Sequence, residues 1–203
     1  MIRKISTKII LFYLILASSL TYGEENKSNR IEVLVNESVI TKYDIFQRVR
    51  MDSILNRFEI NENNYNLLIN KVIDDLIIEK LKNKKIDEYN ITYDKDEFAK
   101  QERRFYSSLD YEEKELRELF DLNNVNYIYL LDFIETELKW QKLIYGLYLR
   151  VISVTDQEIN NLISNNPNIN EEIAGEIILQ KQLDIKSKKL IKDLRDEATI
   201  EYK

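Results

Sequence analysis

Two short segments near the ends of the chain alternate between apolar and polar residues, as β-strands do. The first covers residues 30–45, RIEVLVNESVITKYDI, and places Ile31, Val33 and Val35 on one side. The second is ATIEYK, residues 198–203. An isolated two-stranded ribbon is barely stable in water. We therefore predict that the first segment pairs with the last and closes the domain with a small sheet; two frayed termini are the alternative.

Between these ends, apolar residues recur at three- and four-residue steps, which is typical of amphipathic helices. Only three Gly and one Pro are present to interrupt them. The clearest helix covers residues 64–85, and similar patterns predict long helices over about 127–149 and 171–196. The periodic apolar residues of the first are Tyr65, Leu68, Ile69, Val72, Ile73, Leu76, Ile77 and Leu81. We predict a mainly α fold, a compact multi-helix core that the small sheet closes.

Three helix starts are marked by side chains that cap the backbone N–H groups of a first turn. Thr41, Asp94 and Thr155 are each followed three residues later by an acidic residue. We expect a helix to begin directly after each of them. An Asn-Asn pair at 123–124 separates a short acidic helix from the long one that follows, and Pro167 ends the helix that starts after Thr155.

The first 23 residues have the three regions of a secretory signal peptide. MIRKISTK is basic, the next 12 residues, IILFYLILASSL, are largely apolar, and TYG offers small residues before an acidic stretch. We predict cleavage between Gly23 and Glu24 and export of residues 24–203 to the periplasm. An uncleaved membrane anchor is the alternative, although a bilayer-spanning helix needs roughly 20 apolar residues.

Charge and composition argue against several classes of function. Removal of the leader takes away Arg3, Lys4 and Lys8 and changes the net charge from −6 to −9, which argues against nucleic-acid binding. The sequence has no His and no Cys, so the commonest general base, the thiol nucleophile and the usual transition-metal ligands are missing. Three scattered Gly cannot form a phosphate-binding loop. We predict no enzymatic activity, no cofactor, no metal and no small-molecule substrate.

Aromatic residues are concentrated on the long helix predicted over residues 127–149. Its apolar surface covers more of the circumference than one packed neighbour requires, and surplus apolar area on a domain often marks a binding surface. The alternative is that these residues form the core and its rim. The candidate binding residues are Tyr127, Tyr129, Phe133, Trp140, Tyr145 and Tyr148.

Five segments, in order, resemble the core of the SurA family of periplasmic chaperones. VLVNESVITKYDI (33–45) is similar to the opening strand-turn-helix of that family, and LLINKVIDDLIIEKLKNKKIDEYNIT (67–92) to its second helix. ELRELFDLNNVNYIYLLDFIETELKWQKLI (115–144) resembles the short helix, turn and long helix that follow. VISVTDQEINNLI (151–163) and LIKDLRDEATIEYK (190–203) are similar to the helix before the isomerase modules and to the closing helix and strand.

The chain departs from this family at one place. Its members usually carry one or two parvulin prolyl-isomerase modules, each on the order of a hundred residues, between the two halves of the core. Here SNNPNINEEIAGE, residues 164–176, bridges that place directly. The resemblance therefore divides the chain into an N-terminal core (31–164), a linker without the modules (165–170) and a closing helix and strand (171–203).

The resemblance implies a holdase that works without ATP. Its partners would be unfolded outer-membrane or envelope polypeptides, captured reversibly in an apolar, aromatic-rich groove, with transient proximity to a membrane. Two alternatives are a peptidyl-prolyl isomerase, as the family name would imply, and an adaptor subunit with one folded partner. The absence of His and of the module argues against the isomerase.

Overall fold

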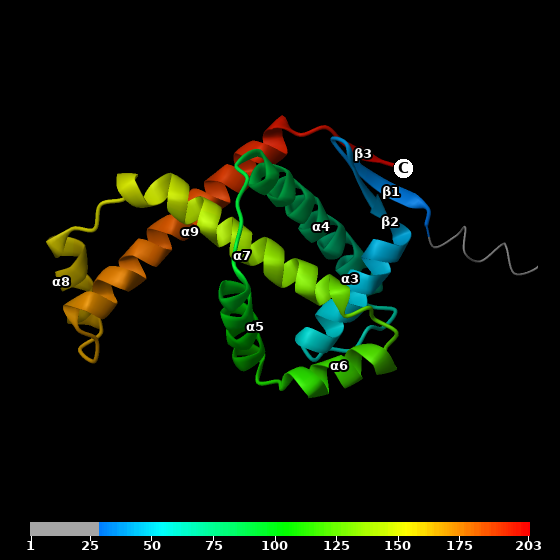
Figure 1. Cartoon of the computed structure of the whole chain (residues 1–203), viewed down its shortest axis with the longest axis horizontal. Coiled ribbons are helices and arrows are strands. Elements are labelled where there is room, and N and C mark those ends of the chain that lie inside the picture. Colours follow the sequence, from blue (N-terminus) through cyan, green and yellow to red (C-terminus); the bar gives the residue numbers. More distant parts are fainter. Residues whose placement is uncertain (1–28) are drawn as a thin grey trace, which may run out of the picture.

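The computed structural model describes residues 29–203, which fold into seven α-helices, one short 3-10 helix and a small three-stranded sheet (Figure 1). The predicted leader, residues 1–23, and the cleavage point between Gly23 and Glu24 lie outside the described residues. Within residues 29–203, no helix has the length and apolar character needed to span a membrane. The predicted fold class, mainly α with a small sheet, is confirmed.

The sheet joins the two ends of the described chain. Its strands are β1 (Ile31–Val35), β2 (Ser38–Thr41) and β3 (Ile200–Tyr202), in the order β2-β1-β3. Both pairings are antiparallel, and β3 pairs with β1 so that Val35 lies opposite Ile200. The predicted pairing of the first alternating segment with the last is therefore confirmed. Figure 1 shows β3 and β1 side by side at one end of the molecule.

The helices and their bounds follow from the capping and periodicity signals. They are α3 (Lys42–Leu55), α4 (Tyr65–Glu88), α5 (Lys95–Leu109), α6 (Glu113–Leu122), α7 (Ile128–Tyr148), the 3-10 helix η1 (Leu149–Val151), α8 (Asp156–Asn165) and α9 (Glu171–Glu197). The capping boxes expected at Thr41, Asp94 and Thr155 are all formed. One helix exceeds its prediction: α4 continues past residue 85, because Ile86 is buried against α7 and α9.

The core consists of three apolar clusters arranged along the molecule. The first packs the sheet against α3, α4 and the end of α9. The second packs α3, α5, α6 and the first half of α7. The third joins α4, the second half of α7 and α9 around Trp140 and Leu183. Because α3, α4, α7 and α9 each contribute to two of the clusters, these four helices connect the three clusters to one another.

Three polar residues of the described chain are buried, Gln47, Arg48 and Thr136, and the side chain of each has a hydrogen-bond partner. Gln47 on α3 donates from Nε2 to the carbonyl oxygen of Asn124 at 3.2 Å and accepts from the N–H of Asn126 at 2.8 Å. The guanidinium of Arg48 bonds the carboxylates of Asp52 and Glu79 at 3.1 Å and 2.8 Å. These contacts fix the loop before α7 and join α3 to α4.

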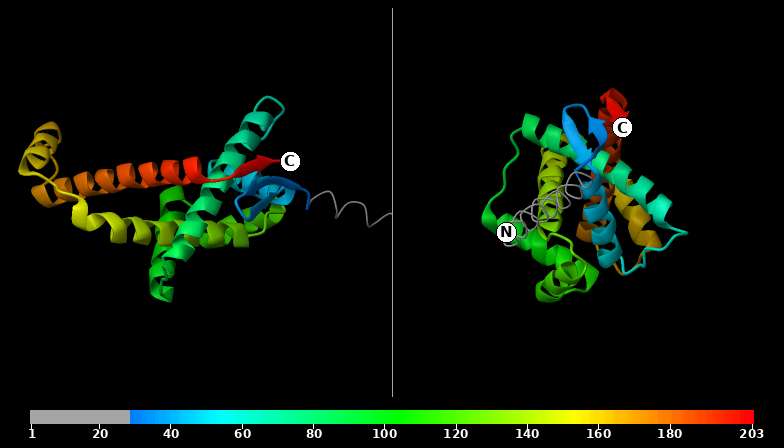
Figure 2. Two further views of the ribbon diagram at one scale, coloured as in Figure 1. Left: turned by 90° about the horizontal axis from the view of Figure 1, so that it is seen from above. Right: turned by 90° about the vertical axis from the view of Figure 1, so that its right-hand side faces the viewer.

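The far end of the molecule from the sheet is formed by α8 and the first part of α9 (Figures 1 and 2). We call α8 together with residues 171–185 the arm. The arm has a narrow buried contact, since Ala174, Ile178 and Leu183 are its only buried residues among residues 156–165 and 171–185. Several isoleucines of the arm stay exposed.

Candidate functional site

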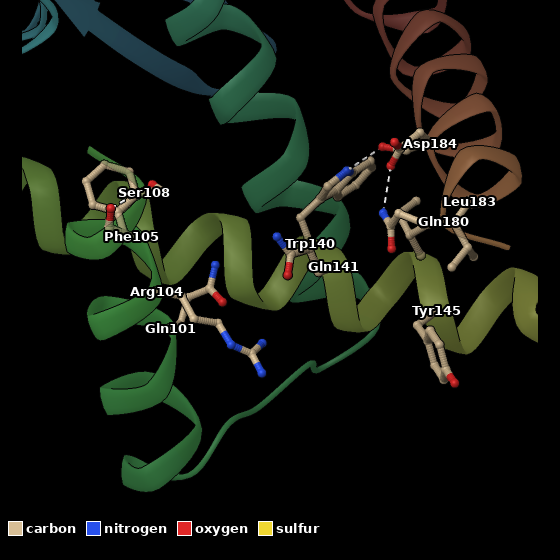
Figure 3. Close-up of a pocket in the computed structure, with 12 residues that line it drawn as sticks. Gln101, Arg104, Phe105, Ser108, Trp140, Gln141, Tyr145, Gln180, Leu183 and Asp184 are labelled. Carbon is tan, nitrogen blue, oxygen red and sulfur yellow. Dashed lines mark hydrogen bonds between the residues drawn. The ribbon is translucent and has the colours of Figure 1, made fainter. Parts of the chain in front are cut away.

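A groove lies between α5, α7 and α9 and has a volume of about 550 Å³ (Figure 3). Helices that are far apart in the sequence form its sides, because α5 ends at Leu109 and α9 begins only at Glu171. We call it the α5–α7–α9 groove. Its lining residues are Gln101, Arg104, Phe105, Ser108, Trp140, Gln141, Ile144, Tyr145, Gln180, Leu183, Asp184 and Ser187.

The base of the groove is apolar and firmly packed. Trp140, Ile144 and Leu183 are 3%, 4% and 5% exposed, so their outer edges reach the groove while the remainder of each side chain belongs to the third cluster. The indole N–H of Trp140 donates to Ser187 Oγ at 2.9 Å, which fixes the ring against α9 (Figure 3). A base held in this way keeps its shape when the groove is empty.

The sides of the groove carry one glutamine from each of the three helices. Gln101 comes from α5, Gln141 from α7 and Gln180 from α9 (Figure 3). Within residues 29–203, Gln101 and Gln141 have no hydrogen-bond partner for their side chains, whereas Gln180 donates to Asp184 at 2.9 Å. A carboxamide both donates and accepts. Such side chains can hydrogen-bond a peptide main chain whatever its sequence.

Opposite charges stand on the two outer helices of the groove. Arg104 projects from α5, and Asp184 stands on α9 (Figure 3). α5 is held to α7 by Lys142, whose ammonium bonds both carboxylate oxygens of Glu97 at 2.9 Å and 2.7 Å. Hydrogen bonding from Lys142, together with a further hydrogen bond from the backbone N–H of Asp94, lowers the pKa of Glu97. The positive side of the groove therefore has a fixed position relative to its base.

Two of the six predicted aromatic residues line the groove. Trp140 lies in its base, and Tyr145 is 50% exposed at its edge, with the hydroxyl pointing away from α9 (Figure 3). Tyr148 lies three residues further along α7, where it packs against the third cluster. The structure therefore brings Trp140 and Tyr145 to one groove.

The other three predicted residues pack against the second cluster. The hydroxyl of Tyr127 donates to that of Tyr106 at 2.9 Å, and Tyr106 donates to Glu102 at 3.0 Å. The hydroxyl of Tyr129 donates to Asp44 at 2.9 Å. Burial, together with these contacts, raises the pKa of Tyr106 and of Tyr129.

Phe133 belongs to the same region as these tyrosines. The guanidinium of Arg48 lies 4.6 Å from the centre of its ring, and Phe105 makes an edge contact with it. The ring is therefore covered on more than one side by neighbouring side chains. Because the hydroxyls of Tyr127 and Tyr129 also have internal partners, these three residues connect α7 to α3, α5 and α6 and lie outside the groove.

Sequence reasoning missed most of the lining residues of the groove. Gln101 and Arg104 of α5 and Gln180 of α9 have no local pattern that distinguishes them from other exposed polar residues. The apolar spacing of the helix after Asp94 predicts Phe105 only as an inward-facing residue. A signal was available in the isolated glutamines of three different helices, but it has meaning only when those helices are known to be neighbours.

Among residues 29–203, no group of three or more His, Cys, Asp and Glu side chains is placed so that it could hold a metal ion. The groove offers amide, hydroxyl, guanidinium and carboxylate groups, which suit non-covalent binding. No protein-family model matches the chain, and no curated protein matches it.

Proposed function

We propose that this protein is an ATP-independent holdase that binds extended segments of unfolded envelope proteins in the α5–α7–α9 groove. The observation that carries the proposal is the combination of an apolar base with a glutamine on each of three helices. The base favours apolar and aromatic side chains, and the glutamines hydrogen-bond the main chain of any sequence. The resemblance to the SurA family supports the same function, and the predicted leader supports a periplasmic location.

The binding mode follows from the size and chemistry of the groove. A volume of about 550 Å³ accommodates a few side chains of an extended segment. Trp140 and Tyr145 offer aromatic surface, and Arg104 and Asp184 offer opposite charges to polar residues of the segment. One short contact of this kind gives an affinity of roughly 1–100 μM. Weak binding permits release of the bound chain without an energy source.

Trp140 provides a direct measurement, because it is the sole tryptophan of the chain and lies in the base of the groove. The probe is a Trp-free peptide of about ten residues in which Tyr or Phe alternates with small polar residues, the pattern of a half-buried β-strand. Saturable change in Trp140 emission during titration is the expected result. An emission spectrum that does not change up to millimolar peptide contradicts the proposed site.

Substitution of the glutamines separates the groove from nonspecific binding. A double variant, Gln101→Ala with Gln141→Ala, removes two amides that have no side-chain partner among the described residues, so its folding should be unaffected. We expect its affinity for the probe to fall about tenfold, which corresponds to about 1.4 kcal/mol. The control is Gln157→Ala, an exposed glutamine on α8 outside the groove. Equal affinities in all three proteins would refute the role of the amides.

Holdase activity is measured by dilution of a urea-unfolded outer-membrane β-barrel protein into buffer without ATP. We expect this protein to delay the rise of light scattering, and the double glutamine variant to delay it less.

Crosslinking in the envelope followed by mass spectrometry should then identify many unfolded clients. One stoichiometric folded partner would instead support the adaptor alternative.

The isomerase alternative is tested with a short X–Pro peptide. We expect the purified protein to leave the rate of cis–trans exchange unchanged, because the sequence has no parvulin module and no His. Acceleration that persists through further purification and tracks the protein would favour the isomerase.

Terminal sequencing of the mature protein tests the leader, with Glu24 expected as the first residue.

A further inference from the structure

The arm carries an apolar stripe that no described element covers. Ile173, Ile177 and Ile185 of α9 are 44%, 45% and 56% exposed. With Lys181, these isoleucines follow one another at four-residue steps, so they form one row that turns slowly around the helix. A single exposed isoleucine is common on protein surfaces. Three along one stripe of a projecting helix form an apolar surface, and such a surface favours binding of a partner.

A hollow between α8 and α9 adjoins this stripe and is distinct from the α5–α7–α9 groove. Its volume is about 630 Å³, and both Ile177 and Ile185 line it. Leu162 of α8 contributes a further apolar side chain to the same hollow, and Lys181 lies between the two isoleucines along α9. A helix laid along this hollow would therefore contact both helices of the arm.

The charges of α9 are divided into two windows at equal distances from Lys181. Residues 171–176, EEIAGE, contain three Glu and no basic residue. Residues 186–191, KSKKLI, contain three Lys and no acidic residue. Within residues 29–203, none of these six charged side chains has an oppositely charged group within 4.0 Å. The opposite charges of the two windows are therefore unpaired within the part of the chain that the structure describes.

We propose that the arm is a homodimer interface in which α9 pairs antiparallel with α9 of a second copy about a two-fold axis near Lys181. In this register Ile177 meets Ile185 of the second copy, and the acidic window 171–176 runs alongside the basic window 186–191, with Glu171 nearest to Lys189 of the second copy. Symmetry repeats each contact, as an isologous interface requires. The pattern is self-complementary, which is the reason for choosing a second copy as the occupant.

The two Lys181 side chains approach each other at the axis. Each is accompanied by Glu158 on α8, which lines the same hollow. The backbone and side chain of Thr155 lower the pKa of Glu158, and Lys181 lowers it further. The axis therefore holds two ammonium groups and two carboxylates, so their charges balance.

The interface is modest in size, so the dimer should depend on concentration and salt. A stable interface buries about 800 Å² per partner, and three half-exposed isoleucines supply much less area than this. The ion pairs between the windows are exposed and are screened by salt. We expect a monomer–dimer equilibrium between about 1 μM and 500 μM, with dissociation on raising the salt concentration.

Analytical ultracentrifugation of residues 24–203 tests the interface directly. The variant Ile177→Glu should raise the dissociation constant at least tenfold. The matched control, Leu67→Glu, alters a leucine of α4 that is 73% exposed and lies outside the arm, and it should leave the equilibrium unchanged. A protein that is monomeric throughout, or a dimer that Ile177→Glu does not weaken, overturns the proposal.

Charge reversal tests the register. Lys188→Glu with Lys189→Glu places acidic groups in both windows and should weaken the dimer. Adding Glu171→Lys with Glu172→Lys restores opposite charges and should recover the affinity. If the second pair of changes weakens the dimer further, the antiparallel register is wrong.

The absence of native Cys permits a test of the axis. Lys181→Cys should form a disulfide-linked dimer under mild oxidation, because a residue on a two-fold axis lies opposite its own copy. Leu67→Cys is the control and should crosslink far more slowly. Equal crosslinking of the two variants refutes the axis. The inference does not depend on the proposed holdase function, since none of these measurements uses a client.

Discussion

Deletion of Thr199–Lys203 measures how strongly the two ends of the described chain hold each other. These five residues include the whole of β3, which forms one edge of the sheet. Besides the β1–β3 ladder itself, three further hydrogen bonds join them to residues around β1. The Asn36 N–H donates to Thr199 O at 2.8 Å, Thr199 N–H donates to Asn36 Oδ1 at 3.0 Å, and Lys203 N–H donates to Glu32 O at 2.9 Å.

The loss of stability follows from these contacts. Each hydrogen bond contributes about 0.5–1.5 kcal/mol net of solvation. Ile200 packs half-buried on the first cluster, which adds about 1–2 kcal/mol. Hydration of the newly exposed edge and the entropy of the released chain offset part of the total, and we expect a net loss of about 2–4 kcal/mol. For a chain of this size the melting temperature should fall by about 5–15 °C.

Amide hydrogen exchange shows whether the loss of stability comes from the edge of β1 that β3 covers. In an antiparallel strand, successive N–H groups point to alternate neighbours. The amide of Asn36 donates to Thr199, the residue before β3, and that of Leu34, two residues earlier, points the same way. Both should exchange faster in the truncated protein than that of Val35, which points toward β2. An unchanged melting temperature together with unchanged exchange at Leu34 and Asn36 would refute the reasoning.

Three further changes test other parts of the fold. Thr41→Ala removes the capping box at the start of α3 and should cost about 1 kcal/mol in thermal unfolding, whereas Thr41→Asp should keep most of it. Gln47→Ala removes the side chain that bonds the Asn124 carbonyl and the Asn126 N–H and should lower the urea stability by about 1–3 kcal/mol; a change below 0.5 kcal/mol would contradict its role in holding this loop. The pKa of Tyr106 is raised in the folded protein, mainly by burial, so its phenol keeps its proton above pH 10 while the unfolded chain releases it. The free energy of unfolding should therefore fall as pH rises above about 10, and Tyr106→Phe should make that fall smaller in urea titrations between about pH 9 and 11.

The parts of the fold that the sequence predicts are those with a local cause. Strand alternation marks β1 and β3, since burial on one face of a sheet repeats every second residue. The capping boxes at Thr41, Asp94 and Thr155 mark helix starts because each satisfies orphan N–H groups within four residues. The pairing of the two ends was also predictable, because the chain offered few other edges to pair.

The binding residues were less predictable, because the six candidate aromatic residues between positions 127 and 148 look alike in the sequence. Their roles depend on partners that lie far away along the chain. Tyr129 finds Asp44, 85 residues away, and Tyr127 finds Tyr106, so both hydroxyls are satisfied internally. Trp140 finds Ser187 and lies at the base of the groove, while Tyr145 finds no such partner among the described residues and stays half exposed.

The sequence by itself determined where helices and strands begin, which of their sides are apolar, and that chemistry based on His or Cys is absent. The tertiary structure alone decided that α5, α7 and α9 enclose a groove, that Gln47 and Arg48 are buried, and that the isoleucines of the arm have no cover. The reason is physical. Capping and periodicity depend on atoms within one or two turns, whereas burial and groove formation depend on which helix surfaces pack together across the whole chain.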